Sequence, residues 1–106
     1  MAVFGDLFGK KAQKAEVENG LQKVTVTVDG GYKPETIQLA KGVPAEITFD
    51  RKDPSGCLAQ VKFKAFDILE DLPLGEKTTI RFTPNQAGKF DYSCGMEMIY
   101  GHYTVK

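Results

Sequence analysis

The chain has little of what most catalytic and hard-metal sites require. It contains no tryptophan, one histidine and two cysteines among 106 residues. A single histidine excludes the sites with two or more imidazoles that Cu(II) and catalytic zinc usually need. The carboxylates show no pairing that indicates acid–base catalysis, and no glycine-rich segment follows a predicted strand and opens a helix, as a phosphate-binding loop requires. We therefore do not expect an enzyme.

Long apolar runs and an excess of either charge are also missing. No segment approaches the roughly 20 apolar residues of a membrane span. Fourteen basic residues balance fourteen acidic ones, so no overall field favours nucleic acid. The apolar residues after Met1 are interrupted by glycine and aspartate, unlike a secretory signal. We expect a cytoplasmic protein, free or at the cytosolic face of the membrane within a larger transporter, with cysteines that serve as thiols.

The length allows one domain with one modest core. Residues 1–19 lack clear alternation, and glycines weaken their helical pattern. We expect these residues to form a loose or partly helical arm, with contact to a membrane surface as a secondary hypothesis. Residues 20–106 are predicted to form the domain itself.

From Leu21 onward, apolar residues alternate with polar ones, which is typical of half-buried strands. Turn signals such as Asp53-Pro54-Ser55-Gly56 separate these segments. Strands are predicted over residues 22–28, 36–39, 45–49, 61–66, 79–82, 90–93 and 100–105. About seven short strands without a convincing helix predict an all-β fold, an antiparallel β-sandwich. Glu70-Asp71 is expected in a solvated turn, and Lys62 and Lys64 on a solvated strand face or a docking patch for an acidic partner.

Soft sulfur ligands gather late in the chain, at Cys94, Met96 and Met98. Thiolate and thioether sulfurs select Cu(I) over hard cations. At this spacing on an extended segment, the three side chains leave from the same face, and Gly95 is expected to let the backbone turn tightly. The alternative is that the two methionines fill gaps in the core.

Cys57 follows a turn and lies between two predicted strands. Because alternate loops of a sandwich gather at the same end, we expect Cys57 to meet Cys94. Two thiolates around one Cu⁺ carry a net negative charge that attracts a second Cu⁺, which thioethers can bind without adding charge. The hypothesis is a site for up to two Cu(I). A Cys57–Cys94 disulfide and inert buried thiols remain alternatives. His102 is either an additional ligand or an ordinary sheet residue.

Residues 28–34, 41–44 and 90–98 resemble the cupredoxin family over about four-fifths of the chain. They are especially similar to the branch that contains Cu(I) chaperones and the N-terminal domains of copper-exporting P-type ATPases. The resemblance implies a Greek-key sandwich in which Cys57 replaces the early histidine of blue-copper proteins, and Met96 or Met98 the late one. It also implies bridging thiolates at Cys57 and Cys94, with Met96 and Met98 on a second, weaker Cu(I).

These expectations combine into a non-catalytic Cu(I) chaperone or metal-binding domain for copper export and resistance. Its partner would be a copper-exporting P-type ATPase or a copper chaperone, and it could be the regulatory domain of such an ATPase. We expect a monomer without nucleic-acid partner or small-molecule substrate. The alternatives are a cupredoxin-type electron carrier and a dithiol redox protein, although the two cysteines lack the close spacing of redox-active pairs.

Overall fold

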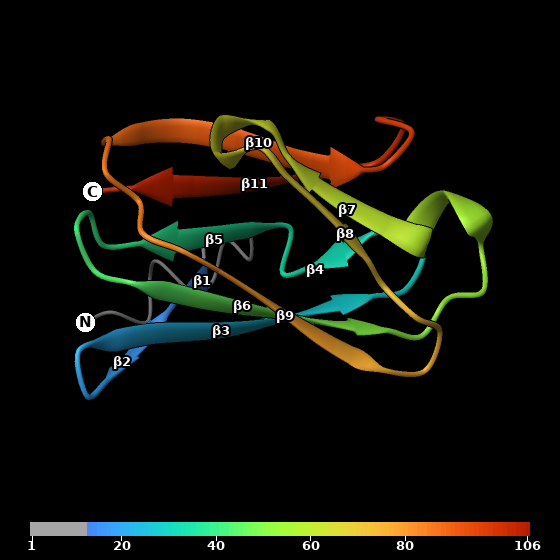
Figure 1. The fold of residues 1–106 in the computed structure, drawn as a ribbon, viewed down its shortest axis with the longest axis horizontal. Helices are drawn as coiled ribbons and strands as arrows, with labels where there is room; N and C mark the ends of the chain where they lie inside the picture. The colour runs from blue at the N-terminus through green and yellow to red at the C-terminus, as the bar shows by residue number, and fades with distance from the viewer. Residues whose placement is uncertain (1–12) are drawn as a thin grey trace, which may run out of the picture.

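A computed structural model describes residues 13–106 and shows two β-sheets that face each other across one core (Figure 1). The strands are β1 (Gln13–Lys14), β2 (Glu16–Glu18), β3 (Leu21–Val28), β4 (Tyr32–Lys33), β5 (Thr36–Leu39), β6 (Ala45–Arg51), β7 (Gln60–Phe63), β8 (Ile68–Asp71), β9 (Lys77–Phe82), β10 (Gly88–Cys94) and β11 (Tyr100–Val105). Two short 3-10 helices, η1 (Gly56–Ala59) and η2 (Lys64–Phe66), flank β7. The prediction of an all-β sandwich is confirmed.

The strand order mixes parallel and antiparallel neighbours. One sheet has the order β1-β5-β11-β10-β7-β8, and the other has β2-β3-β6-β9 with β4 paired to β3. The pairs β3–β6, β5–β11 and β1–β5 are parallel, so the sandwich is mixed rather than antiparallel throughout. Alternation tells which face of a strand is buried, but it carries no information about the direction of the neighbouring strand.

All seven predicted strands are present, and two of them, β5 and β11, have the predicted bounds. The region expected as a turn at Glu70-Asp71 is instead the end of β8, which pairs with β7. Its last three side chains are exposed, so this edge strand lacks the buried alternation by which the other strands were predicted. The segment 64–66, predicted to continue a strand, is η2.

Residues 1–19 were expected to form a loose or partly helical arm, but residues 13–18 of this segment include two short strands. Gln13–Lys14 pairs with β5, and Glu16–Glu18 pairs with β3. Both strands are too short for a periodic pattern to reveal them. Residues 1–12 lie outside the described residues, and with them most of the predicted arm.

The core lies between the inner faces of the two sheets. In β3 the valines Val24, Val26 and Val28 point inward while their neighbours are more exposed, as period-two alternation requires. The aromatic rings of Phe63 and Tyr92 stack at 4.8 Å between their centroids. Cys94, two residues after Tyr92 on β10, continues this buried face to the end of the strand. Cys94, a predicted ligand, is therefore an extension of the core.

Among residues 13–106, no helix has the length and apolar character needed to cross a membrane.

Candidate metal centre

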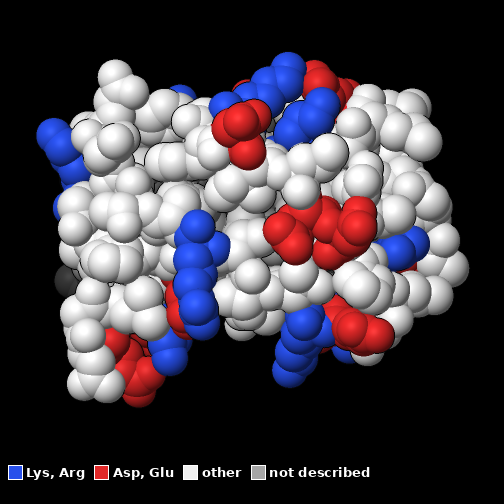
Figure 2. Space-filling view, viewed as in Figure 1, with Lys and Arg blue, Asp and Glu red and all other residues white. Residues whose placement is uncertain are grey.

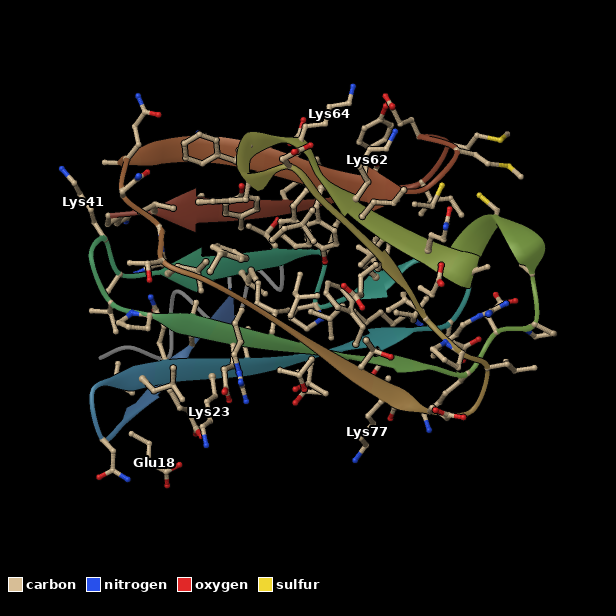
Figure 3. All side chains as sticks on the ribbon, viewed as in Figure 1. Glu18, Lys23, Lys41, Lys62, Lys64 and Lys77 are labelled. Carbon is tan, nitrogen blue, oxygen red and sulfur yellow. The ribbon has the colours of Figure 1, made fainter. Side chains whose placement is uncertain are left out.

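The two thiols meet at one end of the sandwich. Cys57 on η1 and Cys94 at the end of β10 have their Sγ atoms 3.1 Å apart, as free cysteines. Figure 3 shows the sulfur atoms gathered at this end, where η1 and the β10–β11 connection approach each other. Two sulfurs that share one ion can lie no more than about 4.6 Å apart if each metal–thiolate bond is about 2.3 Å, the value for zinc. The expected meeting of Cys57 and Cys94 is confirmed.

Cys94 is held by backbone hydrogen bonds of its strand. It pairs with Val61 of β7, and its N–H donates to the carbonyl of Ile99 at 3.0 Å, which closes the connection to β11. The Cys94 side chain is fully buried. Its sulfur also accepts a hydrogen bond from the N–H of Met98 at 3.3 Å. Backbone geometry therefore fixes this sulfur before any ion arrives.

Cys57 is placed by a buried arginine that sequence reasoning missed. The guanidinium of Arg51 donates to three backbone carbonyls: those of Asp53 at 2.9 Å, Leu72 at 2.8 Å and Ser55 at 2.9 Å. These bonds hold the turn that enters η1. The one sequence signal was an arginine two residues before a turn-forming Asp-Pro-Ser-Gly segment, at the end of an otherwise alternating strand.

The Asp53 side chain adds two hydrogen bonds to the same turn. Its Oδ1 accepts from the N–H of Ser55 at 2.8 Å, and its Oδ2 accepts from the N–H of Gly30 at 2.6 Å. The second bond ties the turn before Cys57 to the Asp29–Gly31 turn between β3 and β4. Together with the bond from Arg51 to the carbonyl of Leu72, this joins three loops at the end of the molecule that carries the thiols.

The loop after Cys94 folds back tightly, but not for the reason expected at Gly95. The positive φ of 58° belongs to Glu97, whose N–H donates to the carbonyl of Cys94 at 2.9 Å. Gly95 is required instead by close approach. A Cβ at Gly95 would stand 2.5 Å from Oε1 and 3.1 Å from Cβ of Gln60 on β7. A side chain there would collide with the side chain of Gln60, which would have to move.

The two methionines lie on the outer side of this loop. Met96 is 64% exposed and Met98 is 71% exposed, so the alternative that they fill gaps in the core is wrong. Exposed large apolar side chains next to a buried thiol are available to a ligand or partner. The structure thus brings all four predicted sulfur residues to one end, with the thiols inside and the thioethers outside.

Glu97, between the two methionines, forms ion pairs with two lysines. Its carboxylate accepts from Lys62 Nζ at 2.7 Å and from Lys64 Nζ at 2.8 Å. The hydrogen bond from Lys62, followed by that from Lys64, lowers the pKa of Glu97 to about 2. Lys62 and Lys64 therefore bind this loop of their own chain, rather than only lining a solvated face.

The two thiols differ in their affinity for protons. Burial opposes ionisation of Cys94, but the hydrogen bonds from the Cys57 thiol and from the N–H groups of Met98, Ile99 and Met96 outweigh it and lower the pKa of Cys94. The hydrogen bond to Cys94, then burial, then the charge on Cys94 raise the pKa of Cys57. Of the two thiols, Cys94 is therefore the more readily ionised and Cys57 the one that holds its proton more firmly.

Other candidate ligands are absent or engaged elsewhere. The His102 Nδ1 contacts Asp91 Oδ1 at 2.7 Å across the β10–β11 pair. Within the part of the chain that the structure describes, no group of three or more His, Cys, Asp or Glu residues converges on a metal position. On the face in Figure 2, the end with the sulfur atoms shows few charged side chains. The donor set is therefore soft, which fits a monovalent copper ion and not a hard divalent one.

Comparison with known proteins gives one family and several close structures. The family model described as Cupredoxin-like domain matches residues 1–105. The crystal structure of the metal-binding domain of the Streptococcus pneumoniae D39 Cu(I)-exporting P-type ATPase CopA, with Cu(I), is 46% identical, with a TM-score of 0.90 over 92% of this chain and 97% of that one. No curated protein matches significantly.

Two further solved structures, one similar in sequence and one similar only in fold, extend this comparison. A copper-binding protein solved in solution in the apo form is 50% identical, with a TM-score of 0.88, over 92% of this chain and all of that one. Auracyanin B is 13% identical, with a TM-score of 0.62 over 87% of this chain and 94% of that one. The auracyanin likeness shows the fold alone, whereas the other two extend to sequence.

Proposed function

The chain belongs to the cupredoxin-like domain family, and from that premise we propose that it binds Cu(I) through Cys57, Cys94, Met96 and Met98 and passes it to a partner. The observation that carries the proposal is the 3.1 Å separation of the two thiol sulfurs at the end of the fold that also presents the methionines. The 46% identity to a domain solved with Cu(I) supports the choice of metal.

Binding begins at the thiol pair, whose sulfurs already lie close enough to share one ion. Cu(I) binds between Cys57 and Cys94, and each proton that the two thiols carry leaves to solvent on the side of Cys57, the more exposed of the two cysteines. The resulting pair of thiolates carries one net negative charge. Met96 and Met98 then hold a second Cu(I) next to it without adding charge, so that the site takes up to two ions.

Release to a partner is favoured by the position of the outer ligands. Thioethers are neutral and weak ligands compared with thiolates, and both methionines are largely exposed. An incoming ligand can reach the outer ion without unfolding the loop. The partner in this proposal is a copper-exporting P-type ATPase or a copper chaperone, the setting is the cytoplasm, and the unit that acts is the monomer.

Electron transfer of the blue-copper kind is not favoured, because the single histidine is bonded to Asp91 and no second imidazole exists in the sequence. A dithiol redox role needs cysteines that form a disulfide. The 3.1 Å contact brings the thiols close enough for oxidation, so reduced conditions are required in every copper experiment.

The test is anaerobic competition for Cu(I) against a strong chelator, with the parent chain and the Cys57→Ser/Cys94→Ser variant. We expect the parent to withdraw Cu(I) from the chelator, and the variant to lose at least about a hundredfold in affinity, more than the usual loss when only an outer-shell partner of a metal site is removed. Equal competition by both chains would end the proposal. A strong blue colour on addition of Cu(II) to the parent would favour electron transfer instead.

A further inference from the structure

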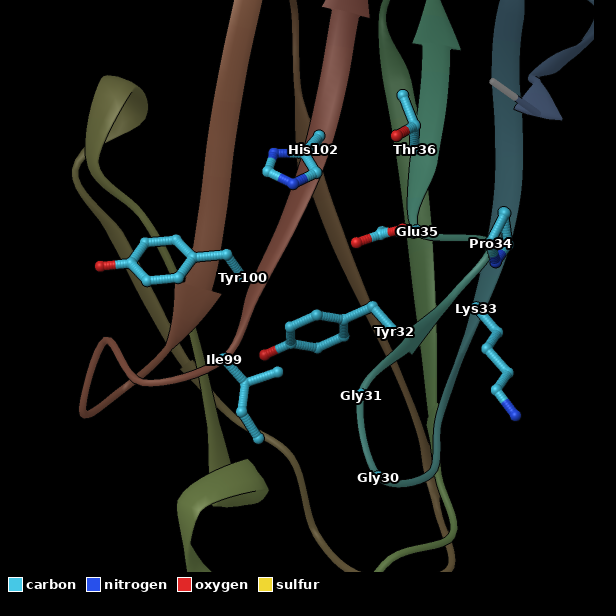
Figure 4. A pocket seen from close by; sticks show the side chains of 10 residues that line it. All are labelled: Gly30, Gly31, Tyr32, Lys33, Pro34, Glu35, Thr36, Ile99, Tyr100 and His102. Atoms are coloured by element: carbon cyan, nitrogen blue, oxygen red, sulfur yellow. The ribbon is translucent and has the colours of Figure 1, made fainter. Parts of the chain in front are cut away.

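A groove lies next to the methionine loop, outside the set of proposed copper ligands. It is formed on one side by residues 30–36, which include β4 and lead into β5, and on the other by Ile99, Tyr100 and His102 (Figure 4). We call it the β4–β11 groove. Its volume is about 740 Å³, within the range of about 300–1,000 Å³ that is typical of ligand sites. It can therefore accept several side chains.

The two sides of the groove differ in chemistry. Glu35 is exposed and has no ion-pair partner among residues 13–106. In Figure 4 its carboxylate points toward β11, whereas the ammonium group of Lys33 points away from the other lining side chains. On the opposite side, Ile99 is half-buried and Tyr100 is 46% exposed. A ligand that fits both sides carries a positive charge close to apolar side chains.

The course of β1 leads back to this groove. β1 is parallel to β5, with Gln13 opposite Ile37. Continued backward in the same register, the chain would bring Lys11 opposite Glu35. Consecutive residues of an extended chain are about 3.3 Å apart, so the five residues from Gln13 back to Phe8 can span about 16 Å. The segment before β1 is thus long enough to cross from β5 to the start of β11.

The sequence of this segment has the chemistry that the groove requires. Lys10 and Lys11 come shortly before β1, and the apolar residues Phe4, Leu7 and Phe8 lie further back. The two cations are therefore near the acidic side of the groove in sequence. The apolar side chains have the length of chain that is needed to reach its other side.

We propose that residues 3–11 dock in the β4–β11 groove of their own chain, with Lys11 paired to Glu35 and the apolar side chains packed against Ile99 and Tyr100. An ion pair near the surface contributes little by itself, so burial of the apolar side chains supplies most of the stabilisation. The connection through β1 makes the contact intramolecular, and the resulting high effective concentration favours it further.

Docking in this groove covers one side of the methionine loop. Tyr100 follows Met98 by two residues, and Ile99 connects the loop to β11. A docked segment therefore hinders a chelator or partner that approaches the outer Cu(I) from this side. This consequence rests on the proposed function, whereas the docking itself does not.

The experiment replaces Phe8 of the full chain with the photo-crosslinking analogue p-benzoylphenylalanine. Chains with light and heavy isotopes are mixed in equal amounts before irradiation, so that mass spectrometry distinguishes links within one chain from links between two chains. We expect links within one chain, to residues 30–36 or 99–102.

Charge variants of this crosslinking chain test the orientation of the segment. We expect Lys11→Glu to lower the yield of these links about two- to fivefold, in line with the loss of an ion pair near the surface. The charge swap Lys11→Glu/Glu35→Lys restores the yield. Lys14→Glu is the matched control, because its backbone is opposite Gln38 and not opposite the groove. It keeps the yield of the parent.

Links to other parts of the sandwich would overturn the inference, as would links only between chains, which would assign the segment to a second copy. Absence of links together with binding of the full chain to phosphatidylglycerol vesicles would assign it to a membrane surface and overturn the inference equally. A swap that fails to restore the yield would contradict the pairing of Lys11 with Glu35.

The consequence for copper is tested with Leu7→Ser/Phe8→Ser, which removes two apolar side chains of the segment and leaves its lysines in place. We expect this variant to surrender the weaker Cu(I) to a chelator faster than the parent does. Equal rates would show that the segment does not cover the methionine loop. The proposed function fails in a different way, through a parent chain that does not compete for Cu(I) at all, and the crosslinks are unaffected by that result.

Discussion

The thiol pair and the methionine pair of the proposed copper site are held in different ways. Cys94 is fully buried and bonded through its backbone to both neighbouring segments, whereas Met98, on the loop that follows, is 71% exposed. The thiols are fixed by the same core and turn contacts that hold the fold. The methionine loop is held chiefly by its turn and by the ion pairs of Glu97 with Lys62 and Lys64. The fold prepares one half of the site in advance and leaves the other half open to solvent.

The largest effect on this contrast is expected from Arg51→Lys. Lysine cannot present the planar fork with which Arg51 reaches three carbonyls, so buried acceptors lose their donors. We expect a loss of about 2–3 kcal/mol in the free energy of unfolding, measured by denaturant titration. Copper affinity at the thiol pair falls about tenfold, in line with other changes behind a metal ligand, because Cys57 is no longer held opposite Cys94.

Arg81→Lys is the matched control for this change. Arg81 is exposed, and its side chain pairs with Glu46 far from the turn before η1. We expect its unfolding free energy to stay within about 0.5 kcal/mol of the parent and its copper affinity to be unchanged. If the two arginine variants behave alike, the turn does not position Cys57.

A smaller and more selective effect is expected from Met96→Leu/Met98→Leu. Leucine keeps the size and apolar character of methionine but offers no sulfur. Because both side chains are exposed, the apo stability should stay within about 0.5 kcal/mol. We expect the variant to keep the tightly bound Cu(I) and to lose the weaker one, measured as copper retained after desalting. Equal loss of both ions would show that thiols and thioethers form a single indivisible site.

The smallest effect is expected from Glu97→Gln. The glutamine keeps the shape of the side chain but loses the charge that attracts Lys62 and Lys64. Since ion pairs near the surface contribute little, we expect the affinity for the weaker Cu(I) to fall about two- to fivefold, with the affinity for the tight ion unchanged. Glu18→Gln, which breaks the surface pair with Lys23, is the control and should change neither. An unchanged affinity for the weaker Cu(I) in Glu97→Gln would mean that the ion pairs of Glu97 do not order the methionines.

Much of this arrangement follows from the sequence, because it depends on local patterns. Alternation predicted seven of the strands, whereas the ligand type inferred from the soft character of Cys94, Met96 and Met98 stays a prediction. The meeting of Cys57 with Cys94 followed from the general rule that alternate loops of a sandwich share an end. These are properties of short segments or of the fold class as a whole.

What the sequence did not reveal depends on contacts between distant segments. The pairing of β3 with β6 is parallel because of how the chain crosses between sheets, which alternation cannot show. The role of Arg51 depends in part on the carbonyl of Leu72, and that of Gly95 on the side chain of Gln60, both on other segments of the chain. The ion pairs of Glu97 likewise form only when β7 and the β10–β11 loop lie side by side. Such contacts exist only after folding.

The central claim, that one end of the sandwich holds Cu(I) on sulfur in an inner and an outer position, is tested most directly by anaerobic titration of the parent chain with Cu(I) in the presence of a graded series of chelators. The account predicts two ions per chain, the first retained against strong chelators and the second surrendered to weak ones. Uptake of no Cu(I), of one ion only, or of two ions with the same affinity would contradict it.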